Sequence, residues 1–395
     1  MKNSINYSVK NYTTKNYPVK YSIVLPCKNE EYTIGLCIKK ARSVLPNSEI
    51  IVVDNNSTDK SASIAKNAGA IVISEKIQGY GAALRRGFKE AKGEYVIMCD
   101  SDDTYDLLEL TKFTKFTENK KNKSYDILIG NRFNKNMKKG SMKFMHRYVG
   151  NPLLSGLMRI LFNTQVRDSH CGFRMINKTS LDKLQLESDG MELASEMIIK
   201  ASQQKMHIKE VDITYYSRNG LSKLKSFNDG WKHLKMMLLY SPNYLFLIPG
   251  ISLFVLGIFL MIILMFQSIT IFGITFVTHP VIIGSLMTIM GFNIMQLWIY
   301  AKTYKMTIFD ESDKLILKIH KQINLEKSML FGFVLVLIGI ILGVSIIFKW
   351  IHTNFGRLND FEKSVFALTI IVLGIQTIFS GFMLSILGTK RNSEL

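Results

Sequence analysis

The sequence predicts an α/β domain with a mostly parallel sheet, followed by four transmembrane helices. Short apolar runs alternate with helical patterns of roughly 10–15 residues, and each run is almost continuously apolar, as in parallel strands covered on both faces. These two observations predict the α/β domain. The helices follow from a third: residues 236–301 contain no Lys, Arg, Asp or Glu, and a stretch of that length accommodates two membrane spans.

The alternating elements lie in the first 235 residues. Residues 1–19 have the polar composition of a disordered tail, and the α/β domain is expected over residues 20–222. We expect strands at 21–26, 49–54, 70–74, 94–99, 126–130, 172–176 and 208–215. We expect helices at 30–44, 58–68 and 81–91.

The C-terminal part carries the predicted spans, residues 244–266, 280–301, 329–348 and 365–388. Buried helices of a soluble domain are the alternative. Segment 223–243 places apolar residues at helical spacing with lysines between them. This pattern is typical of an amphipathic juxtamembrane helix on the membrane surface, or of a helix packed on a core.

The basic residues indicate an orientation in the membrane. The N-terminus lacks the apolar core of a signal peptide. The loop 302–327 carries six Lys, whereas the loop 267–279 carries no Lys or Arg. The positive-inside rule therefore predicts that the α/β domain and the tail 390–395 lie in the cytoplasm.

Charge and cysteines narrow the class of protein. The formal net charge is +19, and with four spans an anionic lipid surface explains it better than nucleic acid. The cysteine spacing is not that of a zinc site, so free thiols in a reducing compartment are expected. The cysteines are Cys27, Cys37, Cys99 and Cys171.

Carboxylates follow several of the predicted strands, at the edge of the sheet where ligands of such folds bind. Asp100 and Asp102 flank one small residue, and in extended chain they point the same way. Such a pair suits Mg²⁺, which one or two carboxylates and substrate phosphates usually hold. Helix capping is the alternative, with Asp103 or Thr104 capping a helix that starts near Tyr105.

Two further stretches are candidates for nucleotide contacts. Asp54, after the second strand, has a carboxylate that suits a nucleobase N–H, or it forms an Asx-turn with Ser57. The turn at 78–87 contains Gly79 and other small residues that let backbone approach a ligand, and it opens a helix whose N-terminus favours anions. It lacks the full dinucleotide fingerprint.

Seven motifs in order resemble the inverting glycosyltransferases of the GT-A fold, in particular the polyprenyl- (dolichyl-) phosphate hexose synthases. The resemblance covers about residues 20–240, and some members of that family also have C-terminal membrane helices. The motifs are LPCKNEE, VVDNNSTD, QGYGAALRRG, CDSDDTYD, GNRF, DSHCGFR and RNGLSKL.

The resemblance implies roles for residues on the donor side. The nucleotide-binding positions are Pro26, Asn29, Glu30, Asp54 and Asn55. The positions that hold the metal and the donor diphosphate are Asp100, Ser101 and Asp102, with Arg218 and Lys223 near the diphosphate. One departure is Thr104, because relatives with a short Asp-Ala-Asp-Leu-Gln motif have a metal-binding Gln there.

On the acceptor side, the resemblance implies that Arg132 faces the acceptor phosphate. Residues 127–167 contain eight Lys or Arg and no Asp or Glu, which makes Lys143 and Arg147 further candidates for that phosphate. A solvated surface loop is the alternative for the lysines of this stretch. Asp103 is a candidate base, although a phosphate acceptor, already largely ionised, makes a base less necessary.

Together these features predict an enzyme that transfers one hexose, with inversion, to a polyprenyl phosphate, with Mg²⁺ or Mn²⁺ as cofactor. The donor is expected to be UDP-glucose and the acceptor undecaprenyl phosphate, and a homo-oligomer is possible. One alternative is a processive polysaccharide synthase, although the chain lacks the Gln-x-x-Arg-Trp motif of those enzymes. The other is a non-catalytic membrane scaffold or lipid-translocation protein.

Overall fold

The computed structural model forms two compact units, Met1–Tyr240 and Ser241–Leu395. Most of the predicted tail 1–19, Lys223 and the tail 390–395 lie outside the residues that the structure describes. Those residues are 18–118, 125–133, 137–138, 140–218, 226–266, 269–271, 274–276, 279–309, 314–322, 324–356 and 360–388.

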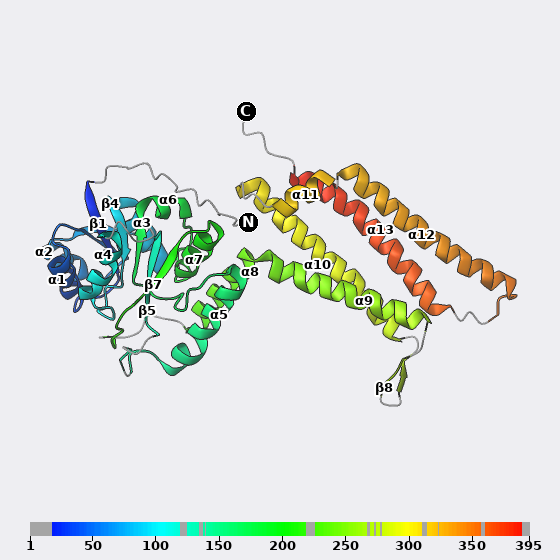
Figure 1. Cartoon of the computed structure of the whole chain (residues 1–395), viewed down its shortest axis with the longest axis horizontal. Helices are drawn as coiled ribbons and strands as arrows, with labels where there is room; N and C mark the ends of the chain where they lie inside the picture. Colours follow the sequence, from blue (N-terminus) through cyan, green and yellow to red (C-terminus); the bar gives the residue numbers. More distant parts are fainter. Residues whose placement is uncertain are drawn as a thin grey trace, which may run out of the picture. The chain divides into compact units, whose positions relative to one another are not determined.

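The first unit contains a seven-stranded sheet flanked by helices, in the strand order β3-β2-β1-β4-β6-β5-β7 (Figure 1). All neighbouring strands are parallel except where β6 meets β4 and β5. This confirms the predicted fold class of a mostly parallel α/β domain. The strands are β1 (Val19–Cys27), β2 (Glu49–Asp54), β3 (Ile71–Ser74), β4 (Gly93–Met98), β5 (Ile127–Asn131), β6 (Arg174–Asn177) and β7 (Ile208–Asp212).

The helices of this unit alternate with the strands. They are α1 (Ile34–Val44), α2 (Ser61–Asn67), α3 (Tyr80–Glu90), α4 (Leu110–Glu118), α5 (Asn151–Phe162), α6 (Lys178–Leu184), α7 (Leu193–Gln203) and α8 (Ser226–Tyr240). Helix α3 packs closely on β1 and β2 because it has a glycine at the contact: a Cβ on Gly87 would lie 2.3 Å from Cγ1 of Val24. The apolar runs of the central strands are buried by such contacts.

The strand register brings the polar strand ends to one edge. Cys27 of β1 pairs with Asp54 of β2, and Val24 of β1 pairs with Met98 of β4. Residues that follow β1, β2 and β4 therefore emerge side by side, because parallel strands end at the same edge of a sheet.

The structure excludes the alternative of helix capping near Tyr105. The first helical turn after β4 begins at Leu107, and its N-cap is Asp106, whose Oδ1 accepts a hydrogen bond from the Leu108 N–H at 3.2 Å. Capping by Asp103 or Thr104 is therefore wrong. Tyr105 instead forms an isolated bridge with Tyr215, which lies beyond the end of β7.

The second unit contains four helical segments long and apolar enough to cross a membrane: Asn243–Met265, Pro280–Thr307, Leu325–His352 and Phe361–Gly388. They belong to helices α9 (Ile248–Phe266, with the preceding turn Asn243–Leu247), α10 (His279–Phe309), α12 (Leu325–His352) and α13 (Phe361–Gly388). Between them lie the hairpin β8 (Ile269–Ile271) and β9 (Ile274–Phe276), and the helix α11 (Lys314–Gln322).

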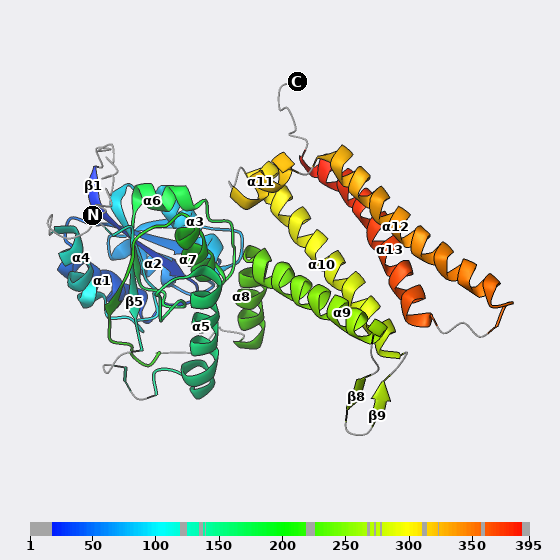
Figure 2. The same ribbon diagram turned by 45° about the vertical axis from the view of Figure 1, so that its right-hand side comes forward.

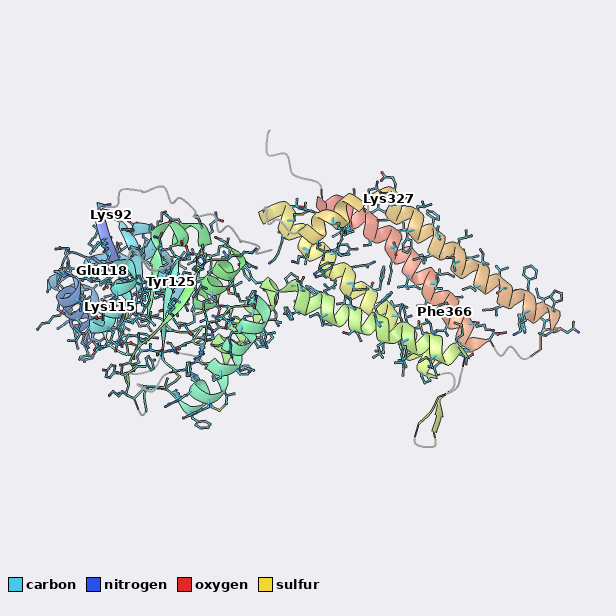
Figure 3. All side chains as sticks on the ribbon, in the orientation of Figure 1. Lys92, Lys115, Glu118, Tyr125, Lys327 and Phe366 are labelled. Carbon is cyan, nitrogen blue, oxygen red and sulfur yellow. The ribbon has the colours of Figure 1, made fainter. Side chains whose placement is uncertain are left out.

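Small residues set the packing of these helices. A Cβ on Gly332 of α12 would lie 2.6 Å from the carbonyl oxygen of Gly374 on α13, so the two backbones touch, as is typical of membrane helices. Phe366, near the N-terminal end of α13 (Figure 3), packs against a buried apolar cluster formed by Met261, Leu264 and Val281.

Candidate active site

The ends of β1 and β4 are joined by hydrogen bonds at the C-terminal edge of the sheet. The hydroxyl of Ser101 donates to the carbonyl of Pro26 at 2.7 Å, and the hydroxyl of Thr33 donates to the carbonyl of Ser101 at 2.7 Å. Ser101 is buried. Ser101 therefore holds the backbone between Asp100 and Asp102 in place. Its side chain is small enough to be buried there, and its hydroxyl forms the hydrogen bond to Pro26.

The two carboxylates are each oriented by a neighbouring hydroxyl group. Oδ1 of Asp100 accepts from the hydroxyl of Tyr80 at 2.7 Å. Oδ1 of Asp102 accepts from the hydroxyl of Thr104 at 2.6 Å and from its N–H at 3.1 Å. Thr104 stands at the position where some relatives have Gln, and in this chain it orients Asp102 through these two hydrogen bonds. Burial and, after it, the charge of Asp102 raise the pKa of Asp100 to about 7.

Arg218 links two of the predicted residues that are far apart in the chain. Its Nη2 bonds to Oε1 of Glu30, and its Nη1 lies 3.4 Å from Oδ2 of Asp102. The guanidinium therefore stands between the loop after β1 and the loop after β4. If Asp102 binds a metal ion, an anionic group bound to that metal would also lie close to the Arg218 guanidinium.

This donor set fits a divalent cation of the Mg²⁺ type. Two carboxylates share one edge. Burial and, after it, the charge of Asp102 raise the pKa of Asp100, and a bound cation would lower it again. Among the described residues no cluster of three or more His, Cys, Asp or Glu side chains provides a complete metal site. Oxygens of a bound diphosphate would have to supply the remaining ligands, as Mg²⁺ usually requires.

Asp103 is paired with a lysine of the neighbouring helix α1. Its backbone is left-handed, with a φ of 59°, and its Oδ1 bonds to Nζ of Lys40 on α1 at 2.8 Å. A carboxylate engaged by a lysine on the neighbouring helix is poorly placed to accept a proton beside Asp100 and Asp102.

Asn29 and Asn55 are used to hold the loops of the site. The Asn29 side chain accepts from the Thr58 N–H at 2.7 Å, which joins the loops after β1 and β2. The amide nitrogen of Asn55 donates to the carbonyls of Glu75 and Ile77, and its oxygen accepts from the Gly79 N–H at 2.9 Å. Asp54 forms the Asx-turn, with its Oδ1 accepting from the Ser57 N–H at 3.2 Å. Nucleotide contacts by these residues stay predictions.

Gly79 has a close neighbour within the protein. A Cβ at this position would lie 2.0 Å from the carbonyl oxygen of Asp189, and one on Gly81 would lie 2.7 Å from the carbonyl oxygen of Gly190. The loop before α7 therefore packs directly on the backbone of this turn, because Gly79 and Gly81 have no side chains. Tyr80 stands between them, so this packing also places the hydroxyl that binds Asp100.

Arg132 is buried in a two-pronged ion pair with Asp168. Nε and Nη2 of Arg132 each lie 2.7 Å from a carboxylate oxygen of Asp168, and the Arg132 N–H donates to the same carboxylate at 3.0 Å. The guanidinium lies over the ring of Tyr215, and its Nη1 is 3.4 Å from the hydroxyl of Tyr105. Most of its donors are thus engaged by the protein.

The loop that carries Asp168 also touches the carboxylates. The hydroxyl of Tyr105 accepts from the Gly172 N–H at 2.9 Å, and a Cβ on Gly172 would lie 2.9 Å from both carboxylate oxygens of Asp100. Tyr80 and Tyr105 lie beside the candidate site although the sequence analysis gave them no role there, whereas Asp168 and Gly172 belong to the loop 168–174, for which the family resemblance implies a place at the sugar or acceptor pocket. The presence of Tyr80 in the motif QGYGAALRRG and of Tyr105 in CDSDDTYD is the signal that could have identified them.

Lys143 and Arg147 lie on a separate, more exposed segment that ends in the helical turn His146–Gly150. Burial lowers the pKa of His146, and the charges of Lys143 and Arg132 lower it further. The guanidinium of Arg147 lies over the ring of Tyr148, 5.3 Å from its centroid. Contacts of these side chains with an acceptor phosphate stay predictions.

Comparison with known proteins gives matches for both units. A family model described as glycosyl transferase family 2 matches residues 22–185. A second, described as the glycosyltransferase family 2 C-terminal transmembrane region, matches residues 299–388. The matches fall on the α/β domain and on the apolar helices, respectively.

Individual relatives match over more of the chain. The low-salt glycan biosynthesis hexosyltransferase Agl6 of Haloferax volcanii is 35% identical over 370 residues, which cover 93% of this chain and 89% of that protein. A dolichyl-phosphate hexose transferase of the same organism is 29% identical over 210 residues, or 53% of this chain and 88% of that protein. Among solved structures, glucosyl-3-phosphoglycerate synthase from Mycobacterium tuberculosis, in complex with Mn²⁺, UDP and phosphoglyceric acid, matches with a TM-score of 0.48 and 20% identity, covering 57% of this chain and 79% of its own.

Proposed function

The chain belongs to glycosyltransferase family 2, and from this premise we propose that it transfers a single hexose from a nucleotide-diphosphate sugar to a polyprenyl phosphate. It is a glycosyltransferase and a multi-pass membrane protein. The donor we propose is UDP-glucose and the acceptor undecaprenyl phosphate, with the α/β domain on the cytoplasmic side of the membrane.

The observation that carries the proposal is the arrangement of Asp100, Asp102 and Arg218 at one edge of the sheet. Two carboxylates and one guanidinium meet there, and the arginine contacts Asp102 at 3.4 Å. This combination suits a diphosphate, because the carboxylates would hold a divalent cation and the arginine would pair with phosphate oxygens directly. A lipid-linked acceptor is supported by the apolar helices and by the dolichyl-phosphate hexose transferase among the relatives.

The proposed reaction requires little proton transfer by the protein. A phosphate monoester has a second pKa of about 6, so at neutral pH the acceptor is already largely a dianion. It needs positioning and partial neutralisation rather than a general base. The pairing of Asp103 with Lys40 at 2.8 Å agrees with this, because it leaves Asp103 engaged away from the pair of carboxylates.

The leaving group is a nucleoside diphosphate, which gains charge as the glycosidic bond breaks. Arg218 would stabilise this charge directly, and Lys223 is expected to join it. When bound at Asp100 and Asp102, Mg²⁺ or Mn²⁺ would act as a Lewis acid on the diphosphate oxygens. Attack of the acceptor oxygen from the face opposite the leaving group would invert the anomeric centre.

On the acceptor side, Arg132 would help to orient the acceptor phosphate rather than neutralise its charge. Its charge is balanced by Asp168, so a single nitrogen, Nη1, lies outside the two-pronged pair. The more exposed Lys143 and Arg147 would then supply most of the countercharge for an incoming phosphate. A donor carbohydrate would lie between these cations and the pair of carboxylates.

Transfer from labelled donors tests the proposal. The purified full-length protein is incubated with undecaprenyl or dolichyl phosphate and with UDP-glucose, UDP-N-acetylglucosamine or GDP-mannose in separate reactions, with Mg²⁺ or Mn²⁺ or with EDTA. Label extracted into organic solvent, and lost with EDTA, is expected for one donor. Product carrying several sugars would favour a processive synthase. Absence of transfer from a wide donor panel, by protein that still binds UDP, would refute the lipid-phosphate acceptor.

A further inference from the structure

A group of large apolar side chains lies exposed on the segment that leads into and through α5. The side chains and their exposed fractions are Phe144 (69%), Met145 (62%), Tyr148 (59%), Val149 (43%), Leu153 (59%) and Ile160 (64%). Single exposed apolar residues are ordinary, but a contiguous patch marks a surface that binds something apolar.

The spacing of these side chains places them on one helical face. Tyr148 and Val149 lie in the turn His146–Gly150, and Leu153 and Ile160 follow on α5 at intervals of four or five and seven residues. The opposite face of α5 is buried, with Ser155 and Met158 inside the domain. The segment is therefore a two-faced element, with one side in the core and one side that the described residues of the domain leave exposed.

Helix α8 continues the same surface. It runs alongside α5 in both views (Figures 1 and 2), and the two helices are in contact. Phe227 and Trp231 of α8 are 91% and 55% exposed, whereas His233 and Met237 are buried. We name the six side chains of the α5 segment together with Phe227 and Trp231 the interfacial surface.

The charged residues around the interfacial surface are mainly basic, and Asp229 on α8 is the acidic exception. Lys143, Arg147 and Arg159 accompany the apolar side chains of the α5 segment, and Lys232 and Lys235 are exposed on α8. No Asp or Glu occurs between residues 127 and 167. Aromatic and apolar side chains with interleaved basic residues are the composition of elements that lie in the interface of an anionic bilayer.

The chain itself indicates a bilayer rather than a protein partner. Helix α8 ends at Tyr240, and the first segment long and apolar enough to cross a membrane begins at Asn243. The C-terminal end of α8 therefore lies at the membrane surface, and α5 contacts this helix. The chain therefore holds this surface close to lipid headgroups, whereas a protein partner would have to reach it by diffusion.

We propose that the interfacial surface inserts into the headgroup and upper acyl region of an anionic bilayer, so that the domain rests on the membrane through α5 as well as through α8. This binding does not depend on the proposed reaction. If that reaction holds as well, the surface keeps Lys143 and Arg147 at the depth at which a lipid phosphate is found.

Depth measurements on spin-labelled protein test this directly. The four native cysteines are buried, so single introduced cysteines can be labelled selectively in the full-length protein. Labels go on Tyr148→Cys, Ile160→Cys and Phe227→Cys, with Ile71→Cys as the control, because Ile71 is 50% exposed on the edge strand β3. The protein is placed in nanodiscs of phosphatidylcholine with phosphatidylglycerol, and collision with O₂ is compared with collision with a water-soluble nickel chelate.

The expected result is that the three labels of the interfacial surface collide more often with O₂ than with the chelate, and that the control does the reverse. Nanodiscs of phosphatidylcholine alone should place the same labels at shallower depth. Labels that collide with the chelate as often as the control would overturn the proposal. Labels shielded from both reagents would also overturn it, because that result indicates a protein partner or a second copy.

A second variant separates this inference from the proposed reaction. Leu153→Asp combined with Ile160→Asp should lower transfer to a long-chain lipid acceptor at least tenfold while leaving transfer to a short, water-soluble polyprenyl phosphate within twofold. The depth measurement needs no catalytic activity, so it gives an answer even if no donor is found. Equal loss with both acceptors would contradict a role at the bilayer.

Discussion

Replacing Asp168 with Asn would leave the guanidinium of Arg132 buried without its counter-charge. Asp168 is fully buried and Arg132 is 6% exposed, so solvent screens the pair little. Two side-chain bonds of 2.7 Å and one backbone N–H bond of 3.0 Å converge on this carboxylate. The Asn side chain keeps the shape and one acceptor oxygen but removes the charge.

The expected cost is large for a single substitution. Removing one partner of a buried ion pair costs about 3–5 kcal/mol, because the remaining charge is left uncompensated. Asn should fall near the lower end, about 3 kcal/mol, since it keeps part of the hydrogen bonding. A typical domain is stable by about 5–15 kcal/mol in total, so the variant should unfold at markedly lower urea concentration.

The assay uses the buried cysteines as reporters. Cys171 and the other three thiols lie inside the α/β domain, so their rate of labelling at rising urea concentration reports the opening of that domain in the full-length protein. Asp182→Asn is the matched control, because its ion pair with Lys178 is exposed at the carboxylate and should cost under about 1 kcal/mol. The double variant Arg132→Met with Asp168→Leu should recover much of the loss. If Asp168→Asn behaves as the control does, the buried-pair reasoning is refuted.

Three further predictions concern the site and its surroundings. Asp102→Ala should lower the transfer rate at least about a hundredfold, since it removes a proposed ligand of the metal and diphosphate. Asp103→Asn should leave the rate within about threefold. Equal effects of the two substitutions in a radiolabel transfer assay would contradict the assigned geometry. Gly172→Ala should lower the rate about a hundredfold with the fold intact, because its Cβ would lie 2.9 Å from the Asp100 carboxylate and displace it; unchanged activity and metal affinity would show that this contact does not matter. Burial and, after it, nearby positive charges lower the pKa of His233 to about 4, so the unfolded chain takes up a proton below pH 6.5 that the folded domain lacks, and this histidine alone should lower stability by about 2 kcal/mol from pH 7 to pH 5. The raised pKa of Asp100 acts in the opposite direction, so the measurement is the difference between the native protein and His233→Gln in urea titrations at both pH values. The variant should gain about 2 kcal/mol relative to the native protein from pH 7 to pH 5, and an equal change in both proteins would count against this histidine.

Expectations about the soluble domain succeeded where they rested on local patterns. The apolar runs identified the strands, and the register of β1 with β2 and β4 places Asp54 and Asp100 at one edge, as expected from parallel strands. The alternative of helix capping by Asp103 was wrong: the backbone at this residue is left-handed, and its side chain pairs with Lys40 on another helix. A contact of that kind has no signature in the neighbouring sequence.

The two alternatives for segment 223–243 also needed the structure. The sequence offered a helix on the membrane surface or one packed on the core. Helix α8 buries His233 and Met237 in the domain while Phe227 and Trp231 stay exposed, so both kinds of face are present on one helix. Periodicity gives the angular position of a side chain on a helix, but the neighbouring elements decide which face is covered.

By itself, the sequence determined the alternation of strands and helices, the four apolar segments and the carboxylates after the strands. These features depend on backbone periodicity and on the length of apolar runs, which are properties of neighbouring residues. Tertiary structure alone decided that Arg218 bonds to Glu30, 188 positions away, and that Arg132 is paired with Asp168, 36 positions away. Such pairs form only after loops from different strands have packed at one edge, because a hydrogen bond requires atoms within about 3 Å that the order of residues does not fix.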